Sequence, residues 1–275
     1  MRLNVSTSAI LYAFGLTTLA GISTGIGGLF TIICKKTNKK FLSVILGFSA
    51  GVMIYLSFME ILHEAMNYLT NVLGETGGSW AAIAAFFGGV FLIAIIDKLI
   101  PSKDNPHESH KIEEKHTCDS SYNNWKLLRT GLLTAVAITI HNFPEGIASF
   151  ISGLKEPSLG IAIAIAIAIH NIPEGIAVSI PIYCATGSKR KAFLLSMASG
   201  LAEPLGALVG YLILQPFLND LVFGILFAAV AGIMVFISFD ELLPTAEEYG
   251  EHHLSILGLI GGMALMAVSL ILFIK

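Results

Sequence analysis

Long apolar runs alternate with short polar segments along this chain. A helix that crosses the apolar core of a bilayer needs about 20 predominantly apolar residues. The runs predict eight such helices, at residues 6–34, 41–70, 80–100, 127–153, 158–185, 190–215, 220–244 and 254–274. The pattern is typical of an all-α polytopic membrane protein. We expect residues 1–275 to form a single transmembrane domain.

Composition supports this class. Of the 275 residues, 55% are hydrophobic and only 13% are charged, and the mean hydropathy is +0.78. A soluble domain carries about 25% charged residues. The net charge of −3 and the lack of a basic stripe with interleaved aromatic residues give no support for nucleic-acid binding. The lipid bilayer is therefore the expected surrounding, and no nucleic-acid partner is expected.

The distribution of Lys and Arg predicts an orientation. Three connections carry most of the positive charge: Lys35, Lys36, Lys39 and Lys40 follow the first helix, Lys98, Lys103, Lys111, Lys115, Lys126 and Arg129 flank the third connection, and Lys189, Arg190 and Lys191 flank the fifth. The second, fourth and sixth connections contain only Lys155. Because cytoplasmic connections are enriched in Lys and Arg, the odd-numbered connections are predicted to be cytoplasmic and both termini extracytoplasmic.

A stretch of the second helix recurs in the seventh. Residues 50–60 (AGVMIYLSFME) align without gaps to residues 231–241 (AGIMVFISFDE). In the predicted topology these helices run in opposite directions, which is typical of the inverted repeats of transporters. Helices one to three and six to eight would be the two repeat units, with helices four and five between them. A chance similarity between two apolar helices is the alternative.

One polar motif occurs twice within the apolar runs, at residues 141–146 (HNFPEG) and 170–175 (HNIPEG). In each copy the His and the Glu are four residues apart and so lie on one face of a helix. Each Pro removes a helical donor and frees a backbone carbonyl oxygen. Imidazole, amide oxygen and carboxylate groups together suit a divalent transition metal.

Every Lys and Arg lies at or beyond the end of a predicted helix, so the ionisable groups farther inside are carboxylates and imidazoles. They are Glu60, His63, Glu64, Asp97, His141, Glu145, His170, Glu174, Glu203, Asp240 and Glu241. Carboxylates buried without a cationic side chain must be protonated, hydrated or neutralised by a bound cation. The imbalance predicts a cation pathway, to which Glu60, His63, Glu64, Asp240 and Glu241 are candidate contributors, although some of these groups lie near helix ends.

Glu203 is the clearest single case outside the two motifs. It lies deep in the sixth helix among small residues that allow a neighbouring helix to approach closely. The alternative for Glu203 is a protonated side chain that donates to a neighbouring carbonyl.

The only sizeable polar connection is 101–126, which contains His107, His110 and His116. It has no apolar periodicity, so we expect a mobile cytoplasmic loop. Its histidines are candidates for transient metal binding, and a solvated loop with incidental histidines is the equal alternative.

These motifs resemble the ZIP family of metal transporters. The resemblance rests on the paired HNxPEG motifs, the segment 200–204 (GLAEP) and the segment 238–244 (SFDELLP), and it covers essentially the whole chain. It implies a 3+2+3 arrangement of helices and uptake of zinc and other divalent metals, such as Fe2+, Mn2+, Co2+ and Cd2+, into the cytoplasm. It also implies a location in a bacterial plasma or inner membrane. No cofactor is expected beyond the transported ions, and a homodimer is a candidate assembly.

The resemblance also implies a binuclear site between helices four and five. Zn2+ would be held by Glu145, His170 and Glu174, with His141 as a further ligand. A neighbouring oxygen-rich site suited to Fe2+ or Mn2+ would comprise Asn142, Glu145, Asn171, Glu174 and Glu203. Glu145 and Glu174 would then bridge the two ions.

Two other classes of function remain as alternatives. An intramembrane metal-dependent hydrolase would use His, Glu and a metal to activate water, but the chain has no His-Glu-X-X-His sequence. A carrier of protons or organic cations would use the motifs as proton relays, whereas the neutral Asn142 and Asn171 favour coordination. We therefore expect a transporter and not an enzyme.

Overall fold

The computed structural model describes residues 6–33, 39–99, 124–214, 217, 219–249 and 252–273. These residues are helical apart from short turns, and none of them forms a strand. The elements are α1 (Thr7–Ile33), α2 (Lys39–Leu56), η1 (Ser57–Ile61), α3 (Leu62–Leu99), α4 (Asn124–Lys155), α5 (Pro157–Thr186), α6 (Lys189–Gly200), α7 (Ala202–Leu214), α8 (Asp220–Ile237), η3 (Ser238–Leu242), α9 (Leu243–Tyr249) and α10 (His252–Phe273). The predicted all-helical class is confirmed.

Six stretches of the described residues are long and apolar enough to cross a membrane: Thr7–Phe30, Lys40–Lys98, Pro157–Thr186, Lys189–Ile213, Asp220–Glu247 and His252–Leu272. The second of them has 59 residues, more than twice the number that one crossing needs (about 20). The 32-residue α4, which carries the first polar motif, is not among the six because its composition is more polar. By length and composition, these stretches agree with a polytopic membrane protein.

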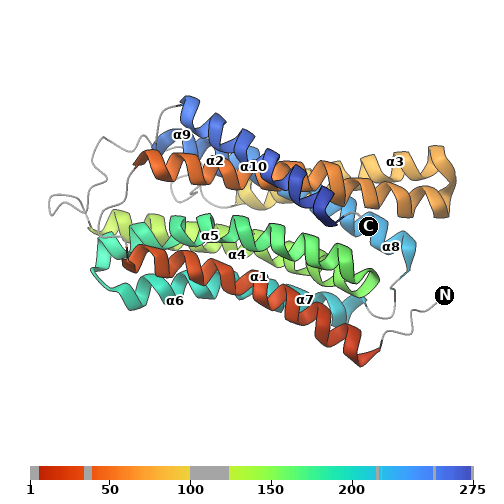
Figure 1. The fold of residues 1–275 in the computed structure, drawn as a ribbon, viewed down its shortest axis with the longest axis horizontal. Helices are drawn as coiled ribbons and strands as arrows, with labels where there is room; N and C mark the ends of the chain where they lie inside the picture. The colour runs from red at the N-terminus through yellow and green to blue at the C-terminus, as the bar shows by residue number, and fades with distance from the viewer. Residues whose placement is uncertain are drawn as a thin grey trace.

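The 59-residue stretch reverses direction within α3. Gly74 has φ 76° and ψ 165°, values outside the helical region, and a Cβ on Gly78 would meet the backbone of Thr70. The rings of Phe58 and Phe86 lie 5.8 Å apart across the hairpin, whose two limbs are visible in Figure 1. The predicted helices 41–70 and 80–100 leave a longer connection, but the helical limbs continue almost to Gly74, because this one residue supplies the turn.

The predicted helix at 190–215 is divided in the structure. Within the single apolar stretch Lys189–Ile213, α6 ends at Gly200 and α7 begins at Ala202. Pro204 has no N–H to donate to the carbonyl of Gly200, so the helical hydrogen bonding is interrupted there. This break lies beside Glu203.

The helices form two bundles (Figure 1). In one, α1 packs along α5, α4 packs along α5 and α7, and α6 contacts α1 and α5. In the other, α3 packs along α8, and α2 along α10. Contacts between α2 and α5 and between α4 and α8 join the bundles. One such contact is direct, because the Ser49 hydroxyl donates to the carbonyl of His170 at 3.2 Å.

Two π-helical segments occupy matching positions of the sequence repeat. η1 begins at Ser57 and η3 at Ser238, which align in the repeat. Each serine is buried and donates to the carbonyl four residues earlier, Ser57 to Met53 at 2.7 Å and Ser238 to Met234 at 2.8 Å. The similarity between 50–60 and 231–241 therefore extends to a rare backbone conformation, which chance similarity of apolar helices does not explain.

Candidate metal site

Both polar motifs lie at the centre of the first bundle. The helices α4 and α5 continue through Pro144 and Pro173 without a break, so each motif keeps its His and Glu on one helix face. All seven predicted ligands are buried, with exposed fractions of 0 or 1%: His141, Asn142, Glu145, His170, Asn171, Glu174 and Glu203. The two helices pack directly against each other, which brings the motifs together.

The His and Glu side chains pair crosswise between the motifs. His141 Nε2 lies 3.2 Å from a carboxylate oxygen of Glu174, and His170 Nε2 lies 3.4 Å from a carboxylate oxygen of Glu145. Each histidine thus faces the glutamate of the other helix. The arrangement gives two matched nitrogen–oxygen pairs, in keeping with the duplicated sequence.

The two asparagines attach the motifs to neighbouring helices. Asn142 donates from its side-chain amide to the carbonyl of Ser199 at 3.2 Å, and Asn171 donates to the carbonyl of Ala20 at 3.0 Å. Both side-chain oxygens are left without a hydrogen bond. Since the amide nitrogens are held by the protein, each asparagine can present its oxygen to a cation.

Glu203 joins the same cluster from α7. One of its carboxylate oxygens accepts a hydrogen bond from the amide of Asn171, and the other has no hydrogen-bond partner. The break at Leu201 starts α7 next to Glu203, and Gly146 lets the backbone of Glu203 approach α4 closely. The structure thus brings Glu203 into contact with both motifs, through Asn171 and Gly146.

The cluster contains many donor atoms that lack a partner. Atoms that make no hydrogen bond and lie in no ion pair are Nδ1 of His170, the side-chain oxygens of Asn142 and Asn171, Oε1 of Glu145, Oε1 of Glu174 and Oε2 of Glu203. No Lys or Arg is among the buried residues that the structure describes. Within the described ranges, no three His, Cys, Asp or Glu side chains already converge as they would around an ion. The donors are instead gathered as adjacent pairs, and a cation between the pairs would satisfy them.

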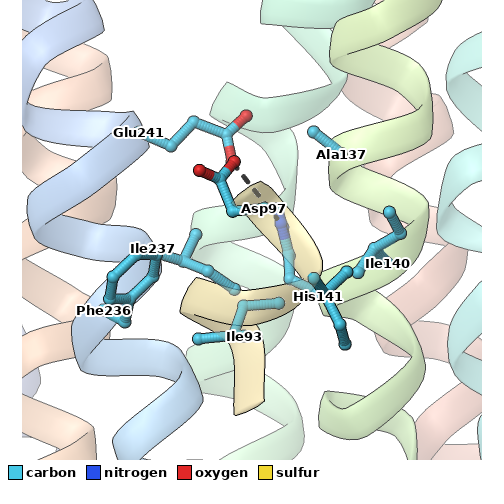
Figure 2. Close-up of a pocket in the computed structure, with 9 residues that line it drawn as sticks. Ile93, Asp97, Ala137, Ile140, His141, Phe236, Ile237 and Glu241 are labelled. Atoms are coloured by element: carbon cyan, nitrogen blue, oxygen red, sulfur yellow. Dashed lines mark ion pairs between the residues drawn. The ribbon is translucent and has the colours of Figure 1, made fainter. Parts of the chain in front are cut away.

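A small cavity lies beside His141 (Figure 2). Its polar lining comes from Asp97, His141 and Glu241, and the rest is apolar. His141 Nδ1 lies 3.9 Å from a carboxylate oxygen of Glu241. The two ring nitrogens of His141 therefore face different carboxylates, Glu174 within the cluster and Glu241 toward the cavity. Glu241, one of the predicted pathway residues, is therefore in contact with the cluster.

The other candidate pathway residues lie outside the cluster. Glu60 is half-buried in η1, in electrostatic interaction with Glu64, His63 and Glu156. Glu64 accepts a hydrogen bond from Asn67 at 3.3 Å, and His63 is exposed. The half-buried Asp240 precedes Glu241 in η3. The loop histidines His107, His110 and His116 lie outside the described residues.

Sequence reasoning did not predict the environment of Lys155. This side chain is only 15% exposed and pairs with Asp220 of α8. Its Nζ lies 4.8 Å from the ring centroid of Tyr68 and 4.4 Å from that of Phe223. One indication of this was present in the sequence: Lys155 is the only Lys or Arg in the second, fourth and sixth connections between the predicted helices.

Comparison with known proteins places this site in a family. The sequence model of the ZIP zinc transporter family matches residues 7–127 and 101–270. The chain is 64% identical over 262 residues to the zinc transporter ZupT of Streptococcus mutans, covering 95% of this chain and 97% of that protein. It is 60% identical over 265 residues to the ZupT of Lysinibacillus sphaericus, covering 96% and 98%.

A third relative, the zinc transporter ZupT of Nitratidesulfovibrio vulgaris, is 58% identical over 271 residues, with 96% of this chain and 98% of that protein covered. The predicted resemblance is confirmed, and these relatives indicate a transporter, not an enzyme. Together with the apolar helices, they indicate a multi-pass protein of the bacterial cell membrane. The chain belongs to the ZIP family of zinc transporters.

Proposed function

We propose that this protein carries Zn2+ and other divalent metal ions into the cytoplasm through a binuclear site between α4 and α5. The observation that carries the proposal is the pair of crossed His–Glu contacts, at 3.2 and 3.4 Å, buried among donor atoms without partners. Ionisable groups at such depth in a membrane protein are expensive and usually functional. A divalent cation would neutralise them.

The donors divide by chemistry into two ligand sets. His141, Glu145, His170 and Glu174 offer the mixed nitrogen and oxygen ligands that Zn2+ accepts. Asn142, Asn171 and Glu203, with the same two glutamates, offer an all-oxygen set that suits Mn2+ or Fe2+. Glu145 and Glu174 would bridge the ions. Because oxygen ligands discriminate poorly among first-row metals, broad specificity is expected.

The proposed architecture has eight membrane crossings in a 3+2+3 arrangement with both termini outside. Six apolar stretches become seven crossings because the stretch containing α2 and α3 folds back at Gly74, and α4 is the eighth. Glycine contacts favour an inverted repeat. Gly89 of α3 packs against the carbonyl of Ala229 in α8, and Gly262 of α10 packs against the carbonyl of Phe48 in α2. Phe48 and Ala229 are 181 residues apart, as are Ser57 and Ser238, so they occupy equivalent positions of the repeat.

The proposed pathway runs along α4. Ions would enter at the end near Glu60, His63 and Glu64, reach the binuclear site, and leave past His141 into the cavity lined by Asp97 and Glu241. Asp240 is a further candidate on this exit side. Movement of the first bundle against the second would expose the site to each side in turn, as expected for repeats around a central site. The loop histidines and a homodimer stay as predictions.

Metal uptake into proteoliposomes tests the proposal. Wild-type protein is compared with Glu145→Ala, His170→Ala and Glu203→Ala, using radioactive zinc and iron. We expect the wild type to take up both metals, Glu145→Ala neither, His170→Ala to lose mainly zinc, and Glu203→Ala mainly iron. If the three variants transport like the wild type, the pathway lies elsewhere. Metal-free proton flux measured in the same vesicles would instead support a proton carrier.

A further inference from the structure

The helix α1 and the segment that joins α6 to α7 make matching contacts with the two motifs. Asn171 donates to the carbonyl of Ala20 in α1, and Asn142 donates to that of Ser199 in α6. Residues 20 and 199 are 179 apart, and residues 142 and 171 are 29 apart. Adding 29 to a residue number in the first motif gives the equivalent residue of the second motif. Adding 179 to a residue number in α1 gives the equivalent residue of α6 or α7.

Glycine contacts follow the same offsets. A Cβ on Gly175 would meet the carbonyl of Thr24, and a Cβ on Gly146 would meet the carbonyl of Glu203. Gly27 faces the carbonyl of Ile172. Its counterpart at position 206, also glycine, faces Phe143, and Gly21 and Gly200 face each other's carbonyls. The backbone of Thr24 therefore packs against the glycine of the second motif in the same way that the backbone of Glu203 packs against the glycine of the first motif.

The Thr24 side chain has an unsatisfied hydroxyl. Thr24 is fully buried, and its Oγ1 has no hydrogen-bond partner. Other helical threonines donate to the carbonyl four residues earlier, as Thr17 does to Ala13 at 3.1 Å. For Thr24 that carbonyl belongs to Ala20, which already accepts the amide of Asn171. A buried hydroxyl without a partner is uncommon and calls for a ligand or water.

The position of this hydroxyl brings it toward the site. The side chain of Thr24 lies against Gly200, where a Cβ would meet its Oγ1. Gly200 directly follows Ser199, the residue that holds Asn142. The offsets also make Asn142 the counterpart of Asn171, which contacts Glu203. Thr24 thus lies between Gly175 of the second motif and Gly200, next to the residue that holds Asn142.

We infer that Thr24 supplies its hydroxyl oxygen to the oxygen-rich metal site, as the neutral counterpart of Glu203. The site then has a carboxylate from α7 on one side and an alcohol from α1 on the other. A neutral oxygen adds a hard ligand without adding charge, which favours Mn2+ or Fe2+ over an ion that prefers nitrogen ligands. Thr24 thereby sets the selectivity of the site. This inference rests on the proposed binuclear site and extends it to α1.

The experiment measures Mn2+ and Zn2+ binding by calorimetry and uptake in proteoliposomes. Thr24→Val keeps the shape and removes the hydroxyl, Thr24→Ser keeps the hydroxyl, and Glu203→Gln tests the proposed site independently. Thr17→Val is the matched control, because Thr17 is equally buried in α1 but its hydroxyl is bonded to Ala13 and to Ser149. All variants are compared at equal protein amounts in the membrane.

We expect Thr24→Val to bind Mn2+ at least about tenfold more weakly, the scale on which changes around a metal site alter affinity. Zn2+ binding should change much less, and Thr24→Ser and Thr17→Val should resemble the wild type. The inference is overturned if Thr24→Val binds both metals like the wild type, or if it and Thr17→Val weaken both metals equally. Glu203→Gln distinguishes a failure of the Thr24 inference from a failure of the proposed site. Unchanged Mn2+ binding in Glu203→Gln would overturn the proposed oxygen-rich site itself.

Discussion

The ammonium group of Lys155 reaches from α4, in the first bundle, to the carboxylate of Asp220 on α8, in the second. The aromatic rings of Tyr68 and Phe223 flank the same ammonium group. Phe223 is fully buried, so the lysine is inserted between the bundles. In α4 this residue lies on the C-terminal side of His141, whereas Ala137 and the cavity lie on the N-terminal side. The two bundles are thus held together by Lys155 near the C-terminal end of α4, and a cavity lies between them on the N-terminal side of His141.

Replacing Lys155 by Met should loosen this end of the molecule. Cation–π contacts contribute about 0.5–2 kcal/mol, depending on how far they are desolvated, and a partly exposed ion pair adds about 0–1 kcal/mol. Their loss should favour conformations in which the bundles separate there. Spin labels on the exposed Val72 and Glu156 should report a longer and broader distance distribution. Lys155→Arg, which keeps the charge, is the control, and an unchanged distribution in Lys155→Met would show that Lys155 is not restraining the bundles.

Replacing Gly146 by Ala should disrupt the site without touching a ligand. The added Cβ would meet the backbone of Glu203, so α4 and α7 would have to separate. Overpacking of this kind costs about 1–3 kcal/mol. We expect a lower unfolding temperature in detergent and loss of zinc uptake. Gly88→Ala is the matched control, because nothing lies within 4 Å of its added Cβ; equal behaviour of the two variants would contradict the packing argument.

Much of the site could be predicted from the sequence because its ligands are repeated at regular spacing. The spacing of His141 and Glu145 fixes a shared helix face, and the second copy at His170 and Glu174 repeats it. What the spacing does not specify is which residue faces which. The crossed pairs depend on how α4 packs against α5, and that packing is a tertiary property.

The features that sequence reasoning missed also depend on tertiary contacts. Thr24 looks like any helical threonine until the Ala20 carbonyl is seen to accept Asn171. The gap left between the predicted helices 41–70 and 80–100 is shorter in the structure for a different reason: one glycine, Gly74, supplies the turn. The break at Leu201 was within reach of the sequence, since Pro204 removes a helical donor.

Replacing Gly74 by Ala tests the role of that turn. Its φ of 76° with ψ of 165° lies in a region essentially reserved for glycine, and other residues placed there cost about 1–3 kcal/mol. Gly74→Ala should therefore destabilise the hairpin within α3 and lower the unfolding temperature. Gly77→Ala, three residues further into the helical limb, makes only an ordinary contact with Leu73 and should be neutral or stabilising. The reverse order of stability would contradict the turn assignment.

The crossed His–Glu pairs predict strong coupling between residues of different motifs. His141 and Glu174 lie 3.2 Å apart, so His141→Gln and Glu174→Gln should each weaken Zn2+ binding by about 10–100-fold. The double variant should be little worse than either single one, because the two side chains act as a unit. Calorimetry on the four proteins measures this coupling.

A surface pair of the same chemistry provides the control for that cycle. His252 and Glu247 lie 2.7 Å apart, but their side chains are 65% and 40% exposed. Water already solvates these two groups, so an ion there gains little from replacing it. His252→Gln and Glu247→Gln should therefore leave Zn2+ affinity unchanged. If the surface variants weaken Zn2+ binding as much as the buried variants do, then burial between α4 and α5 does not account for the Zn2+ affinity of the site.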